Sequence, residues 1–229
     1  MKKCVIVPTY NEKENLQTLI PTLLGLDSEF DILIVDDSSP DGSGQIVEEF
    51  AQKNPRVHLL TRTKKEGLGK AYISGFKWCL ERNYDIISQM DADFSHRPVD
   101  LDRILKMIDD KDFIIGSRYV PGGQVENWGI LRKLISRGGS LYSRLILGYP
   151  TRDWTGGFNH WHAQVLKDIG LDTIMSNGYS FQIELKYKAQ RAGHVAHEEP
   201  ILFADRRVGQ SKMSLKIVLE AFYKVWMIK

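Results

Sequence analysis

The stretch Asp31-Ile32-Leu33-Ile34-Val35-Asp36-Asp37 contains the pattern that decides the fold, a short apolar run that ends in two carboxylates. An apolar run of this length without alternation is typical of a strand buried on both faces. Similar runs at residues 4–7, 57–60, 84–90 and 112–116 are separated by segments with helical periodicity. Strands that alternate with helices predict an α/β fold, in which helices cover both faces of a mostly parallel sheet.

The remaining segments complete this outline. Asn11 is expected to cap the first helix, with Glu12 and Glu14 in its first turn. Residues 120–128 contain Gly122-Gly123 and are expected to form a mobile loop. A further strand is expected at residues 200–204. Helices are expected at residues 11–24, 67–82, 98–109, 131–147 and 180–192, and another after the turn at residues 41–44.

Polar residues stand where three of the predicted strands end. They are Thr9-Tyr10-Asn11-Glu12, Asp36-Asp37-Ser38 and Asp91-Ala92-Asp93. In open parallel sheets, ligands bind beyond the carboxyl ends of the strands. Loops are polar in most proteins, but two of these three clusters contain paired carboxylates. We therefore expect a functional site at this edge of the sheet.

The composition excludes several classes of protein. The chain has 229 residues, of which 42% are hydrophobic and 26% charged, as is ordinary for a globular protein. Its two cysteines, Cys4 and Cys79, provide neither a disulfide framework nor a thiolate zinc site. The segment before the first strand is too short for a signal peptide, and no run approaches the ~18 apolar residues of a membrane span. We therefore expect a cytoplasmic location.

Basic residues are concentrated in two blocks, although the net charge is only +2. Residues 118–152 and residues 206–229 each contain six Lys or Arg and one Asp or Glu. Such blocks in an otherwise acidic chain predict an anionic ligand or an anionic surface. Because no dense basic run or nucleic-acid motif accompanies them, nucleic acid is not expected as a partner.

Asp91-Ala92-Asp93 is a candidate metal site. Hard divalent cations take oxygen ligands, and Mg²⁺ commonly takes one or two carboxylates together with substrate phosphates. A turn after a strand can bring both carboxylates together, which suits Mg²⁺ or Mn²⁺ held against a diphosphate, with Ser95 as a weak additional ligand. The alternative is a solvated turn that caps the next helix, because an Asp-x-Asp motif alone is a weak signal.

Asp36-Asp37 allows an interpretation of another class. Ile34-Val35-Asp36-Asp37-Ser38 is similar to the acidic pocket of a receiver domain, a signalling module that accepts a phosphoryl group. In that module the acid pair follows the first strand of a much shorter chain, whereas here it follows the second strand. In a nucleotide-binding interpretation, Asp37 would hydrogen-bond the base or the ribose.

Several segments together resemble the family-2 glycosyltransferases of the GT-A fold. This resemblance rests on residues 7–12 with Asn15-Leu16, residues 35–42 and residues 90–93. A narrower resemblance, to the dolichyl (polyprenyl) phosphate mannosyltransferases, rests on five further segments and extends over residues 4–213. These segments are Gly67-Leu68-Gly69-Lys70-Ala71-Tyr72, Gly116-Ser117-Arg118-Tyr119, Arg132-Lys133-Leu134-Ile135-Ser136-Arg137-Gly138, Asp153-Trp154-Thr155-Gly156-Gly157-Phe158, and Arg206 with Gly209-Gln210-Ser211-Lys212.

The resemblance implies that mannose is transferred from GDP-mannose to a polyprenyl phosphate, with inversion at the anomeric carbon. It implies a divalent cation at Asp91 and Asp93, and it makes Asp93, Arg118 and Arg132 the candidate catalytic residues. Asp153 would orient the acceptor phosphate site or cap local structure. The donor-binding residues implied are Pro8, Tyr10, Glu12, Val35, Asp37, Asp91, Ala92, Arg118, Arg206 and Lys212.

The chemistry of a phosphate acceptor agrees with these residues. A phosphate monoester is anionic at neutral pH, so it needs no general base, unlike a sugar hydroxyl. It needs positive charge that holds it beside a second anionic substrate, and residues 118–152 supply that charge. Arg132 and Ser136 are four positions apart on one face of a predicted helix, so they can contact the same phosphate.

Other functions stay open. UDP-glucose or another nucleotide sugar would serve as the donor on the same fold with the same acceptor. A transferase that acts on a hydroxyl acceptor would need a catalytic base and a Gln-x-x-Arg-Trp type of motif, which the sequence lacks. A non-catalytic, partner-binding subunit would be expected to lose the acidic pair, which is intact.

The chain is expected to consist of a catalytic domain at residues 1–213 and an amphipathic helix at residues 214–229. Lys216, Glu220 and Lys224 form a charged stripe on that helix, and Trp226 stands among its apolar residues. Such a helix can lie in a membrane interface, pack on a membrane-anchoring partner subunit or pack on the protein itself. The lipid part of the acceptor favours peripheral attachment to the cytoplasmic face of a membrane.

Overall fold

The computed structural model describes residues 1–204 and 223–229. Strands and helices alternate through the first half of the chain, as predicted. The elements of that half are β1 (Lys3–Thr9), α1 (Lys13–Leu24), β2 (Asp31–Asp36), α2 (Ser43–Lys53), β3 (Val57–Thr61), α3 (Leu68–Glu81), β4 (Ile86–Gln89), α4 (Pro98–Leu105) and β5 (Phe113–Ser117). Those of the second half are β6 (Gln124–Val125), α5 (Ile130–Leu147), β7 (Asn159–His162), α6 (Ala163–Asp168), the 3-10 helix η1 (Leu171–Thr173), α7 (Gly178–Arg191), β8 (Ala196–Pro200) and β9 (Leu202–Phe203).

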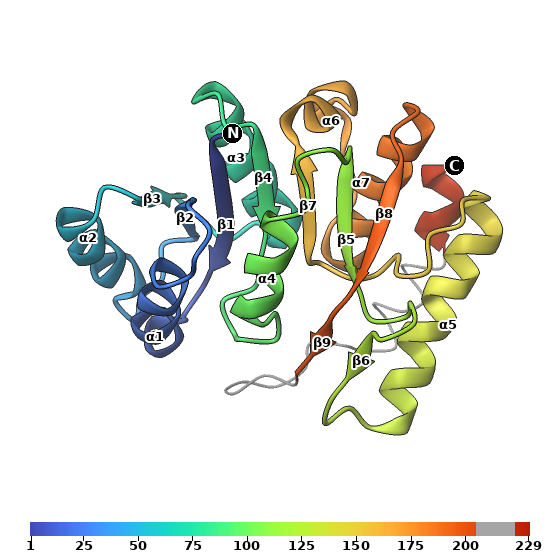
Figure 1. The fold of residues 1–229 in the computed structure, drawn as a ribbon, viewed down its shortest axis with the longest axis horizontal. Helices are drawn as coiled ribbons and strands as arrows, with labels where there is room; N and C mark the ends of the chain where they lie inside the picture. Colours follow the sequence, from blue (N-terminus) through green and yellow to red (C-terminus); the bar gives the residue numbers. More distant parts are fainter. Residues whose placement is uncertain (205–222) are drawn as a thin grey trace.

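Within the described residues, seven strands form one sheet in the order β3-β2-β1-β4-β7-β5-β8 (Figure 1). Every neighbouring pair is parallel except the two pairs that β7 makes, because β7 runs antiparallel to both β4 and β5. The short strands β6 and β9 pair separately, beside the carboxyl end of β5. The predicted α/β fold with a mostly parallel sheet is therefore confirmed.

Alternate residues of the central strands enter two different cores. Ile6 of β1 and Leu33 of β2 pack with α3, α6 and α7 on one face of the sheet. Val5 and Ile32, their neighbours in the chain, pack with α1 and α4 on the other face. Successive side chains of a strand point to opposite faces, so a strand covered on both sides must be apolar throughout. This explains the continuous apolar runs of the sequence.

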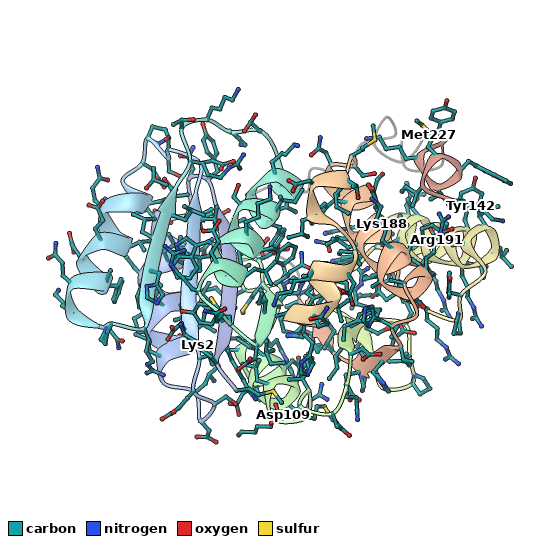
Figure 2. The ribbon with its side chains drawn as sticks, turned by 90° about the horizontal axis from the view of Figure 1, so that it is seen from above. Lys2, Asp109, Tyr142, Lys188, Arg191 and Met227 are labelled. Atoms are coloured by element: carbon teal, nitrogen blue, oxygen red, sulfur yellow. The ribbon has the colours of Figure 1, made fainter. Side chains whose placement is uncertain are left out.

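Helix α5 lies at one end of the molecule and packs against α7 and the C-terminal residues (Figure 1). Residues 223–228 are helical, and Val225 is buried in a small third core with Leu147 of α5. The indole of Trp226 donates a hydrogen bond to the Tyr142 hydroxyl over 2.7 Å. Figure 2 shows Tyr142, Arg191 and Met227 gathered at this end. Most of the predicted tail helix, and the predicted domain boundary at residue 213, lie outside the described residues.

Three local predictions are wrong. Asn11 does not cap α1, because its φ of 59° turns the chain before the helix and Glu12 occupies the N-cap position. Helix α4 ends at Leu105 rather than at residue 109. The predicted loop at residues 120–128 contains β6, which pairs with β9. None of the helices in the described part of the chain is long and apolar enough to cross a membrane.

Candidate active site

The polar clusters at the strand ends have unusual backbone geometry. Among the described residues, five that are not glycine have a positive φ; two of these stand in the predicted clusters and a third directly follows the last cluster. Asn11 follows β1, Ser38 follows β2 and Phe94 follows β4, with φ values of 59°, 53° and 62°. Left-handed geometry at a bulky residue such as Phe94 is costly, and such strain is concentrated at functional sites. The backbone therefore supports a functional site at the carboxyl edge of the sheet.

The Asp91-Ala92-Asp93 turn follows β4 and is partly shielded from solvent. Asp93 is buried, and one of its carboxylate oxygens accepts a hydrogen bond from the backbone N–H of Ser95 over 3.1 Å. Asp91 is half-buried, with a carboxylate oxygen 3.5 Å from the hydroxyl of Tyr72. Burial raises the pKa of Tyr72 well above its ordinary value, and the charges of both aspartates raise it further. Both carboxylates therefore lie near the same phenol.

The residues of this turn fit a hard divalent cation. Asp91 and Asp93 supply carboxylate oxygens, and the buried Ser95 hydroxyl has no hydrogen-bond partner among the described residues. In residues 1–204 and 223–229, no cluster of three or more His, Cys, Asp or Glu could hold a metal. The oxygens of Asp91, Asp93 and Ser95 suit a cation that takes a few protein oxygens and completes its coordination with substrate oxygens, as Mg²⁺ usually does.

His96 fixes the metal turn to the rest of the site. Its Nδ1 accepts a hydrogen bond from the backbone N–H of Asp91 over 3.1 Å, and its ring stacks on Phe158 with centroids 4.6 Å apart. Burial lowers the pKa of His96, while Asp91 and Asp93 act in the opposite direction. A neutral imidazole with Nδ1 as acceptor agrees with this burial. His96 is thus a residue that positions the turn.

The edge formed by β1 and β2 carries the predicted nucleotide residues. Asp37 accepts a hydrogen bond from the Arg62 guanidinium over 2.6 Å, and both side chains are largely buried. Burial raises the pKa of Asp37, and the charge of Arg62 opposes that effect. The sequence analysis did not identify Arg62. Its position directly after β3 repeats the pattern of polar residues at strand ends, and this signal could have found it.

The other predicted donor residues differ in accessibility. Pro8 and Tyr10 are half-buried, and the Lys65 ammonium lies 3.5 Å from the centre of the Tyr10 ring. Glu12 accepts a hydrogen bond from the Asn15 amide over 2.6 Å. Val35 is fully buried in the core beneath α3, so only its backbone is placed to meet a ligand. Arg206 and Lys212 lie outside the described residues.

Arg118 and Asp153 form a buried ion pair across the site. Arg118 follows β5 directly, and its Nε and Nη2 donate to the two carboxylate oxygens of Asp153 over 2.8 and 2.7 Å. Its backbone N–H donates to the same carboxylate over 3.0 Å. Burial alone would raise the pKa of Asp153, but the charge and hydrogen bonds of Arg118 outweigh it and lower the pKa to about 2. Asp153 is therefore a permanent carboxylate that orients Arg118.

Lys186 holds the turn that contains Asp153, and the sequence analysis did not identify it. This lysine of α7 is fully buried, and its ammonium donates to the carbonyl oxygens of Asp153, Trp154 and Gly156 over 2.8, 3.2 and 2.8 Å. Burial lowers its pKa to about 8, and the charge of Asp153 limits the decrease. Three carbonyls satisfy the three donors of an ammonium group, so Lys186 fixes the backbone from residue 153 to 156.

The predicted acceptor residues lie at the start of α5, next to Arg118. Arg132 stacks its guanidinium on the Trp128 ring, 3.9 Å from the ring centre. Ser136 is buried and accepts a hydrogen bond from the Tyr119 hydroxyl over 2.7 Å. Thr155 connects this group to Arg118, because its hydroxyl accepts a hydrogen bond from Arg118 over 2.9 Å and lies 3.4 Å from Ser136 Oγ.

Phe203 joins the metal turn to the acceptor residues. Its ring lies edge-on to His96, with centroids 5.3 Å apart, and edge-on to Trp128 at 5.4 Å. The Arg118 guanidinium lies 5.4 Å from the centre of the same ring. Phe203 thus contacts Arg118, Trp128 before α5, and His96, which holds the turn of Asp91, although these residues are far apart in the sequence.

A family model of glycosyl transferase family 2 matches residues 4–170. The chain belongs to glycosyl transferase family 2. Among curated members, an undecaprenyl-phosphate mannosyltransferase of Micrococcus luteus is 47% identical over 225 residues, which cover 98% of this chain and 93% of that protein. A polyprenol monophosphomannose synthase of Mycolicibacterium smegmatis is 45% identical, with coverage of 96% and 84%. A dolichol-phosphate mannosyltransferase of Pyrococcus furiosus is 38% identical, with coverage of 96% and 61%. The predicted resemblance is thereby confirmed.

Solved structures of glycosyltransferases confirm the GT-A fold. A glucosyl-3-phosphoglycerate synthase from Mycobacterium tuberculosis, solved with Mn²⁺ and uridine diphosphate, matches with a TM-score of 0.66 and 16% identity, covering 99% of this chain and 78% of that one. A mannosyltransferase from Pyrobaculum calidifontis, solved with GDP-Man and Mn²⁺, gives a TM-score of 0.63 and 16% identity, with coverage of 99% and 64%. At these identities the likeness concerns the fold alone.

Proposed function

We propose that this family 2 glycosyltransferase transfers mannose from GDP-mannose to a polyprenyl phosphate with inversion, and that it requires Mg²⁺ or Mn²⁺. The names of its relatives support the coarser assignment, a polyprenyl-phosphate mannosyltransferase. The observation that carries the proposal is that Phe203 contacts Arg118, Trp128 before α5, and His96, which holds the aspartate turn after β4. Such a site can hold two anionic substrates side by side.

The donor would bind along the ends of β1, β2 and β4. Asp37 is positioned by Arg62 to accept hydrogen bonds from the nucleoside, and Pro8, Tyr10 and Glu12 lie on the same edge of the sheet. A divalent cation held by Asp91 and Asp93 would neutralise the charge of the leaving diphosphate. Ala92 lies between these aspartates. Arg206 and Lys212 remain predicted donor-binding residues.

The state of Asp153 favours a phosphate acceptor over a hydroxyl acceptor. A sugar hydroxyl needs a general base with a pKa near the working pH. Asp153 is fully buried, has a pKa of about 2 and accepts three hydrogen bonds from Arg118, so it is a poor base. A phosphate monoester is already anionic. Arg132 and Ser136 at the start of α5 would supply the cation and the hydroxyl donor that it requires.

The outer face of α5 supports docking to a membrane surface. Leu134, Leu141 and Leu145 are more than half exposed and fall on one side of the helix, next to Ile130. Exposed basic residues border this apolar stripe: Lys133, Arg137 and Arg144. A helix with apolar and basic sides of this kind suits an anionic membrane interface. We propose peripheral attachment to the cytoplasmic face, with membrane-anchoring subunits as additional partners.

A panel of nucleotide sugars, offered with a short-chain polyprenyl phosphate, tests the proposal. We expect transfer from GDP-mannose in the presence of Mg²⁺ or Mn²⁺ and none after chelation. Asp93→Asn is expected to lower kcat at least a hundredfold, because loss of preorganised charge stabilisation has effects of roughly this size. Asp110→Asn, at an exposed surface carboxylate, is the matched control and should keep wild-type activity.

Three results would contradict parts of this scheme. Transfer from UDP-glucose in preference to GDP-mannose would show that GDP-mannose is not the donor. Near-normal kcat in Asp93→Asn would show that the reaction does not require a cation held by Asp93. Transfer to a sugar hydroxyl but not to the prenyl phosphate would overturn the acceptor assignment.

A further inference from the structure

Trp128 has a buried donor that the functions assigned so far do not use. The side chain stands just before α5 and is only 8% exposed. Its indole N–H is buried and has no hydrogen-bond partner in the part of the chain that the structure describes. Buried donors are almost always satisfied, because an unpaired one has lost its hydrogen bond to water without a replacement. This N–H therefore calls for a partner that residues 1–204 and 223–229 do not supply.

The surroundings of Trp128 define the charge of that partner. The Arg132 guanidinium lies 3.9 Å from the centre of the indole and the Arg118 guanidinium lies 5.5 Å from it. Two guanidinium groups this close to the indole ring, together with its N–H, make an environment for an anion with several acceptor oxygens. The first turn of α5 follows immediately, and the amino end of a helix adds to the positive potential.

The backbone turns just before Trp128, and the side chain of Trp128 is buried. Asn127 has a φ of 56°, in the left-handed region that asparagine tolerates better than most residues. Phe203 supports the ring from the side, with an interplanar angle of 76°. The turn and the edge-on contact hold the indole ring in place, while its N–H remains without a partner among the described residues. A ligand for this N–H would account for the unpaired donor.

We infer that Trp128 is a further ligand of the acceptor, whose indole N–H donates a hydrogen bond to an oxygen of the phosphate monoester. The inference rests on the proposed function and adds a third donor to Arg132 and Ser136. The acceptor phosphate is favoured over the donor diphosphate because Trp128 stacks on Arg132, at the α5 side of the site. Arg132 is only half-buried, so its side chain can shift when the phosphate arrives.

Indole NMR combined with binding measurements tests this inference. Protein labelled with ¹⁵N-tryptophan gives one indole signal for each of its five tryptophans, and Trp128→Phe identifies the signal of Trp128. On saturation with a short-chain prenyl phosphate, we expect the indole proton of Trp128 to move downfield. Trp128→Phe keeps an aromatic ring but removes the donor, so its Kd for the prenyl phosphate should rise about tenfold or more, while its Kd for GDP-mannose stays within twofold.

Trp78→Phe is the matched control. Trp78 also carries a guanidinium over its ring, that of Arg82 at 4.2 Å, but it lies on α3 away from the site. This variant should bind the prenyl phosphate as the wild type does. If Trp128→Phe does not fold, the other four Trp→Phe variants assign the remaining indole signals, so the signal of Trp128 is identified by elimination. The titration of the wild-type protein with prenyl phosphate then tests the inference.

The outcomes separate this inference from the proposed function. Wild-type protein that binds no prenyl phosphate contradicts the proposed function itself. Wild-type protein that binds it while the Trp128 signal stays in place contradicts the inference alone. A parallel titration with GDP and Mg²⁺ distinguishes the two phosphate sources, because a shift of Trp128 with GDP but not with prenyl phosphate would overturn the acceptor assignment.

Discussion

The ion pair between Arg118 and Asp153 shows how a buried charge can serve the site without reacting. The Asp153 carboxylate accepts hydrogen bonds from two nitrogens of the Arg118 guanidinium. It also accepts one from the backbone N–H of Gly156 over 2.9 Å. Lys186 then fixes the same turn through its carbonyls. Because Asp153 neutralises much of the charge of Arg118, we expect Arg132 to be the stronger attraction for the acceptor phosphate.

Asp153→Asn is expected to lower the free energy of unfolding by about 3–5 kcal/mol at neutral pH, because it leaves a buried guanidinium without its counter-charge. The pKa of Asp153 is about 2 in the folded protein and 3.8 for an unperturbed aspartate. The ion pair therefore stabilises the fold fully above about pH 4, and this contribution is lost as the pH falls towards 2. Urea unfolding of both proteins between pH 7 and pH 2 measures the difference.

The difference in the free energy of unfolding between wild type and Asp153→Asn should be constant above pH 5 and decrease below pH 4. If this difference in the free energy of unfolding stays the same down to pH 2, Asp153 and Arg118 do not form the ionised pair described. Asp110→Asn is again the control, since its carboxylate pairs with Lys111 at an exposed surface and should have little effect at any pH.

Residue types at strand ends could be predicted from the sequence, but their partners could not. Asp91, Asp93 and Asp37 stand at the edge where the pattern of strands put them. Nothing in the sequence indicated that Asp153 pairs with a residue 35 positions earlier, or that Lys186 is fully buried. Lysine is rarely buried without partners, and its three carbonyl partners exist only once the turn at residues 153–156 has folded against α7.

At the scale of elements, the strands that the sequence analysis missed are the polar ones. Strand β7 reads Asn-His-Trp-His and β8 reads Ala-His-Glu-Glu-Pro, so neither shows an apolar run. Both are strands because neighbours in the sheet supply their backbone hydrogen bonds: β7 lies between β4 and β5, and β8 pairs with β5. Strand preference depends strongly on such context, which a local pattern does not contain.

Helix α5 has a weak point that can be strengthened. Gly138 stands in the interior of this helix, and a Cβ atom added there would meet nothing within 4 Å. Gly138→Ala is therefore expected to raise the free energy of unfolding by about 0.5–1 kcal/mol, because alanine loses less backbone entropy than glycine in a helix. Thermal or urea unfolding provides the measurement.

Gly123→Ala is the contrasting variant on the same side of the site. A Cβ atom at Gly123 would lie 2.6 Å from the carbonyl oxygen of Ser117 and 2.8 Å from the backbone of Arg118, so this variant should be destabilised. Equal changes in the free energy of unfolding for Gly138→Ala and Gly123→Ala would contradict the packing described around α5 and β5.

At the scale of the whole molecule, the anionic-substrate site and the exposed apolar stripe share one helix. The first turn of α5 carries Arg132, and its later turns carry Leu134, Leu141 and Leu145 on the outer side. A membrane bound along this stripe would lie beside the acceptor site. The lipid tail of the acceptor could then remain in the bilayer while its phosphate reaches Arg132.

Replacing Leu134, Leu141 and Leu145 together with serine is expected to weaken binding to vesicles of anionic phospholipid tenfold or more, since each leucine loses apolar area that the membrane would cover. Sedimentation with vesicles measures this, and the kcat with a short-chain acceptor should not change. Val99→Ser combined with Val195→Ser alters exposed apolar residues elsewhere and should bind vesicles normally. Wild-type vesicle binding by the leucine variant would exclude α5 as the docking surface.

The antiparallel strand β7 also sets the distance between the two halves of the site. It separates β4, which ends in the aspartate turn, from β5, which ends at Arg118, so two strand spacings or roughly 10 Å lie between them. A strand running the other way would have pointed its own exit loop into that interval. The loop that enters β7 lies at this edge instead, where Asp153 and Thr155 contact Arg118 and Phe158 stacks on His96. We expect the transferred hexose to lie between the aspartate turn and Arg118.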